Sequence, residues 1–175
     1  MKYRHITLSG NICSGKSTVA QLLHKKLGWK FYSTGKYFRE KAKKEGLSLY
    51  FAEEQNDAET RIADDYVASL LKNKEHYVID AWLGGYLARN MDHVYRLYLA
   101  AQEETRIYRY SQREGISDQK AAKQIHERER FLLSKLRAIY KTDDFFNSKH
   151  YNRVFETDNL PPEVIVDEII KAVQS

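Results

Sequence analysis

The chain has 175 residues, a length that suits one domain with its own hydrophobic core. Its 29 basic side chains exceed its 24 acidic ones by five, a mild excess that suits the binding of small polyanions. One cysteine excludes an intramolecular disulfide, and no apolar run approaches the roughly 20 residues that cross a bilayer. We therefore expect a cytoplasmic, monomeric protein with no membrane segment.

Short apolar strands and longer helical segments alternate along the chain. The predicted strands are residues 6–9, 30–32, 77–80, 94–99 and 153–156. The predicted helices, which show helical periodicity, are residues 16–27, 35–44, 59–71, 103–113, 118–140 and 161–173. Strands that alternate with helices indicate βαβ units around a parallel sheet, so we expect an α/β fold.

The first predicted strand is followed by the pattern G-x-x-x-x-G-K-[ST], which is typical of a P-loop. Its glycines let backbone N–H groups curl around phosphate oxygens, and the next helix points its positive N-terminus at the same anion. Lys16 supplies a charge to the β- and γ-phosphates of ATP, and the Ser17 hydroxyl is placed to ligate Mg²⁺. The predicted ATP site comprises Gly10, Asn11, Ile12, Cys13, Ser14, Gly15, Lys16, Ser17 and Thr18.

Cys13 lies inside this loop and allows two interpretations. The favoured one is a small side chain that fills space in the loop. The open alternative is a redox switch, because the surrounding backbone N–H groups could lower the pKa of the thiol.

An acceptor for the phosphoryl group is predicted at the ends of the second and third strands. Gly35 lets the chain turn after the second strand, and Arg39 lies one turn into the next helix. Arg39 could bind a phosphate through two parallel hydrogen bonds, and an ordinary solvated arginine is an equal alternative. Asp80 ends the third strand, where ligands of parallel sheets bind, so it could hold Mg²⁺ or orient the attacking oxygen.

Arginines recur on two of the predicted helices. Arg106, Arg109 and Arg113 form one stripe, and Arg130 and Arg137 lie seven residues apart on the next helix. Such side chains neutralise the charge that develops on a migrating phosphoryl group. Thirteen tyrosines could instead stack on nucleic-acid bases, but acidic residues interleave with the arginines throughout, so nucleic-acid binding is not predicted.

Together these motifs resemble the nucleoside monophosphate kinases, and within them the short cytidylate kinases typical of archaea. The likeness covers nearly the whole chain, through the P-loop and residues 33–39, 104–109, 112–115, 128–137 and 151–173. It implies a three-layer P-loop fold with a five-stranded parallel sheet of order 2-3-1-4-5, flanked by helices. It also implies one kinase domain over residues 1–175, with an acceptor-binding helical region at about 35–72 and a helical lid at about 114–137.

The resemblance implies transfer of a phosphoryl group from ATP, with Mg²⁺, to a nucleotide acceptor, CMP or dCMP. On the donor side, Lys16 and Ser17 would serve ATP and Mg²⁺. The remaining implied roles are contacts to the acceptor by Thr34 and Arg39, and a phosphate clamp of Arg106, Arg130 and Arg137 when the lid closes.

Two positions depart from the family pattern, and both lie on the acceptor side. Trp82 stands where the family usually has an arginine that faces the acceptor, and Ser134 stands where an acidic residue is usual. An indole can stack on a base but offers only one hydrogen-bond donor. Two alternatives therefore stay open: a P-loop kinase of another nucleotide, nucleoside or metabolite, and an ATP-binding module without turnover.

Overall fold

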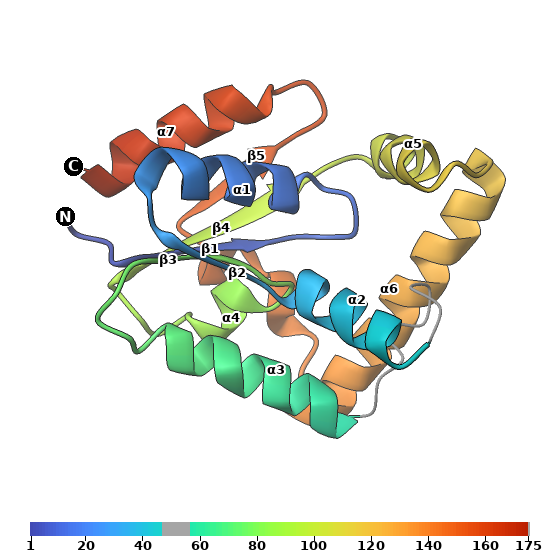
Figure 1. Cartoon of the computed structure of the whole chain (residues 1–175), viewed down its shortest axis with the longest axis horizontal. Helices are drawn as coiled ribbons and strands as arrows, with labels where there is room; N and C mark the ends of the chain where they lie inside the picture. The colour runs from blue at the N-terminus through green and yellow to red at the C-terminus, as the bar shows by residue number, and fades with distance from the viewer. Residues whose placement is uncertain (47–56, 175) are drawn as a thin grey trace.

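The computed structural model describes residues 1–46 and 57–174, which form a parallel sheet between layers of helices (Figure 1). The sheet has the order β2-β3-β1-β4-β5, and every neighbouring pair is parallel. This confirms the predicted α/β fold and strand order, and each predicted strand is present with its ends shifted by at most one residue. The strands are β1 (His5–Ser9), β2 (Lys30–Ser33), β3 (Tyr77–Asp80), β4 (Val94–Ala100) and β5 (Arg153–Glu156).

The helices cover both faces of this sheet. Helices α1 and α7 pack together on one face, and α3 and α4 lie on the other (Figure 1). Figure 1 shows α2, α5 and α6 at the end toward which the strands run, with both termini at the opposite end. The helices are α1 (Lys16–Leu27), α2 (Thr34–Lys44), α3 (Asp57–Leu70), α4 (Gly84–Leu87), α5 (Glu103–Glu114), α6 (Asp118–Tyr140) and α7 (Pro162–Gln174).

Three short elements were not predicted from the sequence. They are α4 and the 3₁₀ turns Asp144–Phe146 and Ser148–His150. Each has at most one turn, too few residues for an apolar period to appear. Part of the predicted acceptor region 35–72 lies outside the described residues. No helix in the described part of the chain is long and apolar enough to cross a membrane.

The central strand β1 is buried along its whole length, and its two faces carry different chemistry. Ile6 and Leu8 enter the main core, which includes side chains of α1 and α7. Because side chains alternate along a strand, His5, Thr7 and Ser9 face the other layer. The Ser9 hydroxyl there donates to the Ala81 carbonyl at 3.3 Å and accepts the Gly85 N–H at 3.0 Å.

Two glycines bring α4 close to the sheet. A Cβ on Gly84 would lie 3.1 Å from the Thr7 Cβ, and one on Gly85 would lie 2.2 Å from a ring carbon of Tyr151. The Gly85 distance is far inside van der Waals contact, so any larger side chain would push α4 off the sheet. This pair of glycines therefore fixes the segment that follows β3.

His5 is a fully buried histidine near the amino ends of the strands. Its ring lies 6.0 Å from the Tyr77 ring and 5.6 Å from the His93 ring. Burial lowers the pKa of His5 to about 4, and the nearby His93 acts in the same direction. The neutral imidazole is thus the form that the fold accommodates.

We expect His5 to make the stability of the protein depend on pH. Its folded pKa lies below its unfolded value, so the unfolded chain binds more protons between pH 6.5 and about 4. The His5 contribution to the free energy of unfolding is present above pH 6.5 and falls by up to about 3 kcal/mol as the pH drops through this window. Urea unfolding of the wild type and of His5→Leu at several pH values measures it.

The control for this prediction is His126→Leu, since His126 is an exposed histidine on α6. His5→Leu should flatten the pH dependence more than His126→Leu does, because of the two only His5 is buried. Parallel pH profiles for the wild type and His5→Leu would contradict the prediction.

Candidate functional site

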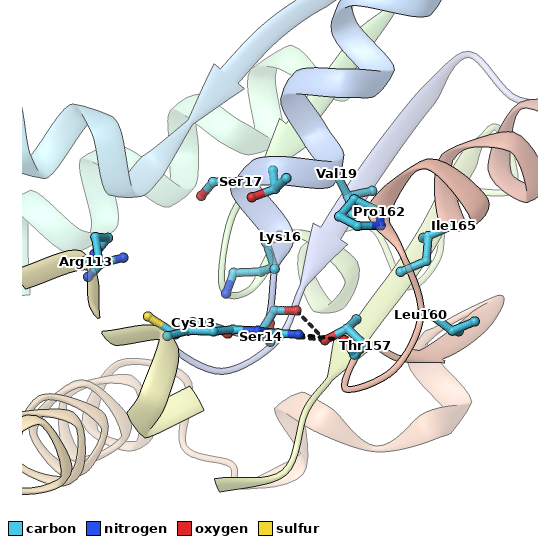
Figure 2. Close-up of a pocket in the computed structure, with 13 residues that line it drawn as sticks. Cys13, Ser14, Lys16, Ser17, Val19, Arg113, Thr157, Leu160, Pro162 and Ile165 are labelled. Carbon is cyan, nitrogen blue, oxygen red and sulfur yellow. Dashed lines mark hydrogen bonds between the residues drawn. The ribbon is translucent and has the colours of Figure 1, made fainter. Parts of the chain in front are cut away.

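The loop between β1 and α1 adopts the curled backbone that its glycines predict. Gly10 has φ 142° and Gly15 has φ 92°, both left-handed values that favour glycine. A Cβ on Gly10 would lie 2.2 Å from the Leu99 carbonyl oxygen, so the loop packs directly against β4. A hollow opens beside the loop, lined by residues 13–19 and by side chains of α5 and α7 (Figure 2).

Lys16 sits at the centre of the loop. Its Nζ donates a hydrogen bond to the Asn11 carbonyl at 2.6 Å. Burial lowers the pKa of Lys16, and the carboxylate of Asp80 opposes that effect. An ammonium group that has lost its water is stabilised by any anion that enters beside it, so this side chain is suited to bind phosphate.

Asp80 and Ser17 bring a carboxylate and a hydroxyl group together beside the loop. The Ser17 hydroxyl donates to Asp80 Oδ2 at 2.6 Å, and the Ser33 hydroxyl donates to the same oxygen at 3.1 Å. Carboxylate and hydroxyl oxygens suit Mg²⁺, which usually completes its shell with phosphate oxygens and water. No group of three His, Cys, Asp or Glu side chains among the described residues could hold a metal alone. The residues therefore fit an ion that arrives with a nucleotide.

A second hollow lies on the other side of Lys16 and Ser17. Four of the five predicted acceptor residues line it: Thr34, Gly35, Arg39 and Trp82. Gly35 allows this arrangement because the Arg39 guanidinium folds over it, 3.0 Å from where a Cβ would stand. The fifth predicted residue, Ser134, is exposed on α6 and lines neither hollow.

The arginines of α6 lie on different faces of the helix. Arg130 and Arg137 are exposed and line neither hollow, and Arg137 pairs with Asp143. Arg128 lines the second hollow instead, and it donates to the Tyr110 hydroxyl at 3.2 Å. The inward face of α6 carries residues four apart along the helix: Arg128, Leu132 and Leu136.

The two arginines of α5 that were not assigned roles also reach the site. Arg113 lines both hollows. Arg109 lines the first hollow and donates to the Thr157 carbonyl at 2.6 Å. The Thr157 hydroxyl in turn donates to the Ser14 carbonyl at 3.0 Å, a contact visible in Figure 2. These bonds attach the loop after β5 to the P-loop.

Arg106 and Glu129 form a buried ion pair next to the P-loop. Arg106 Nη1 lies 2.7 Å from Glu129 Oε1, and the two side chains are only 7% and 14% exposed. The same carboxylate oxygen accepts the Ile12 N–H at 3.0 Å, and Arg106 donates to the Ile12 carbonyl. Glu129 therefore ties α6 to both α5 and the P-loop, a role that no sequence pattern indicates because its partners are 23 and 117 residues away.

Cys13 has φ 60° and lies partly buried in the P-loop. Burial raises the pKa of its thiol, although Arg113 and Lys16 oppose this effect. The thiolate that oxidation requires is therefore scarce at neutral pH, which favours the space-filling interpretation over the redox switch.

Removing the Glu129 carboxylate should destabilise the protein strongly. Breaking a buried ion pair leaves an uncompensated charge, here that of Arg106, at a cost of about 3–5 kcal/mol. We expect Glu129→Ala to lower the free energy of unfolding, measured in urea, by that amount. Asp167→Ala breaks the exposed pair between Lys26 and Asp167 and should cost less than about 1 kcal/mol. Equal losses for the two variants would refute this assignment.

Comparisons with known proteins find relatives that match nearly the whole chain. A family model described as the cytidylate kinase-like family matches residues 5–159. The cytidylate kinase of Sulfurisphaera tokodaii is 36% identical over 174 residues, covering 97% of this chain and 93% of that protein. The cytidylate kinase of Thermoplasma volcanium is 32% identical over 175 residues, covering 96% of this chain and 90% of that protein. The fold is shared with a gluconokinase structure from Sinorhizobium meliloti, with a TM-score of 0.65 and 15% sequence identity. The match covers 99% of this chain and 94% of the gluconokinase chain.

Proposed function

Because the chain belongs to the cytidylate kinase-like family, we propose that it transfers the terminal phosphoryl group of ATP to CMP or dCMP. The observation in the structure that supports this proposal is the arrangement of the two hollows. The two hollows share Cys13, Lys16, Ser17 and Arg113, so they meet at the P-loop. A donor in the first and an acceptor in the second would place their phosphates together at this junction, as phosphoryl transfer requires.

The donor side would hold the triphosphate of ATP. Backbone N–H groups of residues 10–17 and the N-terminus of α1 attract its oxygens, and Lys16 neutralises charge on the β- and γ-phosphates. Ser17 and Asp80 would hold Mg²⁺, which neutralises further phosphate charge when it is bound. Thr18 is exposed at the rim of the same hollow.

The acceptor side would hold the nucleoside monophosphate. Arg39, Arg113 and Arg128 line the second hollow, where their guanidinium groups can bind the acceptor phosphate and the migrating group. The attacking oxygen belongs to a phosphate that is already anionic, so no strong base is needed. Positioning and charge neutralisation then account for most of the rate enhancement.

We assign the phosphate contact on α6 to Arg128 in place of Arg130 and Arg137. Both of those side chains would need a large rotation of α6 to reach the junction, since they lie on its exposed face. Arg106 would act through the P-loop and Glu129, because its guanidinium is engaged there.

Phosphorylation of a different small acceptor is a second candidate function, and Trp82 is the observation that favours it. The indole lines the second hollow, where the resemblance leads us to expect an arginine. It removes one positive charge from the acceptor side and adds an aromatic surface.

Turnover by the purified protein tests the proposed function. ADP formation with ATP and Mg²⁺ should depend on CMP or dCMP, and turnover of AMP should be much slower. Lys16→Ala should lower kcat/KM by roughly 10²- to 10³-fold or more, because it removes a charge aimed at the transferring group. CMP-independent ADP formation, or a Lys16→Ala enzyme of unchanged activity, would defeat the proposal.

The two neighbouring arginines of α6 provide a matched comparison. Arg128→Ala should lower kcat by roughly 10²-fold or more, as expected for loss of a side chain that contacts the migrating group. Arg130→Ala, two residues away on the exposed face, should change kcat by less than about threefold, the effect of a surface substitution. Steady-state kinetics with CMP measures both, and the reverse ranking would restore the sequence-based assignment.

A further inference from the structure

Asp64 on α3 is a buried carboxylic acid to which the proposed mechanism gives no role. It is 9% exposed and lines the second hollow. Asp80 is the other carboxylic acid among the described residues that line this hollow, and Ser17 and Ser33 already engage it. A desolvated carboxyl group is costly unless a hydrogen-bond partner compensates it, so Asp64 calls for an explanation.

One oxygen of Asp64 is held in place by the end of α6. The Tyr140 hydroxyl donates to Asp64 Oδ2 at 2.7 Å. The Tyr140 ring is itself packed edge-on against Tyr86 and Phe145, each at 6.0 Å between ring centroids. Among the described residues no hydrogen bond reaches Asp64 Oδ1. The carboxyl group is therefore oriented by one oxygen and keeps the other for a ligand.

Trp82 supplies an apolar surface in the same hollow. Its ring meets the Phe146 ring edge-on at 5.3 Å, which restricts its rotation. With the acceptor phosphate at the junction beside Lys16 and Ser17, the nucleobase would extend into the rest of the hollow, which Trp82 and Asp64 line. Aromatic rings bind bases by stacking and are tolerant of base identity, so Trp82 alone would not select cytosine.

We propose that Asp64 accepts a hydrogen bond from the exocyclic amino group of a pyrimidine base that stacks on Trp82, and thereby selects CMP over UMP. This inference rests on the proposed function and names its specificity-determining residue. Carboxylates accept hydrogen bonds from the amino group of cytosine. Uracil presents a carbonyl oxygen at that position, and this oxygen is repelled by the carboxylate.

The shifted pKa of Asp64 is consistent with this hydrogen bond to the base. Burial raises the pKa of its carboxyl group to about 6, against the lowering effect of the Tyr140 hydrogen bond. At neutral pH most molecules therefore carry the ionised form, which can only accept hydrogen bonds. A donor from the base would relieve the desolvation of this charge.

The experiment compares kcat/KM for CMP and UMP in the wild type and three variants. Asp64→Asn keeps the size of the side chain but replaces one acceptor oxygen by a donor, which suits uracil. It should lower the CMP/UMP ratio by roughly 10- to 100-fold, the discrimination that one good base contact provides. Asp65→Asn, the exposed neighbour on the same helix, should leave the ratio unchanged. Tyr140→Phe should alter the ratio less than Asp64→Asn, because it keeps the carboxylate.

A purely structural role for Asp64 predicts a different outcome. Asp64→Asn and Tyr140→Phe would then lower turnover of CMP and UMP by the same factor, and this would overturn the inference. A nucleotide of pyrimidin-2-one, which lacks the amino group, tests the wild type without any substitution. It should have a kcat/KM at least roughly tenfold below that of CMP, and turnover equal to that of CMP would also overturn the inference.

Failure of this inference and failure of the proposed function are distinguishable. A wild-type protein that phosphorylates neither CMP nor dCMP refutes the function itself. A wild-type protein that phosphorylates CMP and UMP equally well keeps the kinase activity and refutes the role of Asp64.

Discussion

Asp80 reaches from the end of β3 to hydroxyl groups on two other elements, Ser17 on α1 and Ser33 at the end of β2. This carboxylate, 4% exposed, joins the phosphate loop to the start of α2. The two hollows meet at this point because Lys16 and Ser17 form part of both walls. The relative position of donor and acceptor therefore depends on one buried charge that three neighbouring segments share, and small shifts at Asp80 would separate groups that must react within van der Waals distance.

The sheet and the phosphate loop could be predicted because their signals are local. An apolar strand, a glycine-bounded loop and a periodic helix each follow from adjacent residues, and the glycines at 10 and 15 have the left-handed backbone that the pattern requires. Spacing alone does not fix the phase of a helix, so the prediction for the arginines of α6 did not single out Arg128, and the roles predicted for Arg130 and Arg137 stay predictions. Leu132 and Leu136 mark its inner face, and Arg128 shares that face. The contacts of Glu129 and Asp64 could not be predicted because their partners are distant in sequence.

Helix α6 is attached to the rest of the protein near its middle and at its C-terminal end. Arg128 contacts Tyr110 on α5, Glu129 contacts the P-loop and Arg106, and Tyr140 contacts Asp64 on α3. If α6 moves as a rigid helix, a displacement near Arg128 and Glu129 also moves the Tyr140 hydroxyl, which donates a hydrogen bond to Asp64. The segment 114–137 that was predicted as a lid includes Arg128 and Glu129, and the same helix continues beyond it to Tyr140.

Gly84 and Gly85 hold α4 close to Thr7 and Tyr151, and at Gly85 there is no room for a side chain. Trp82, only two residues earlier, is half-buried and points into a hollow. Neighbouring positions of one short segment are therefore under different constraints: the glycines hold the backbone close to the sheet, and the indole shapes the wall of the hollow. A replacement at residue 82 would change that wall while the backbone that carries it stays anchored by the glycines.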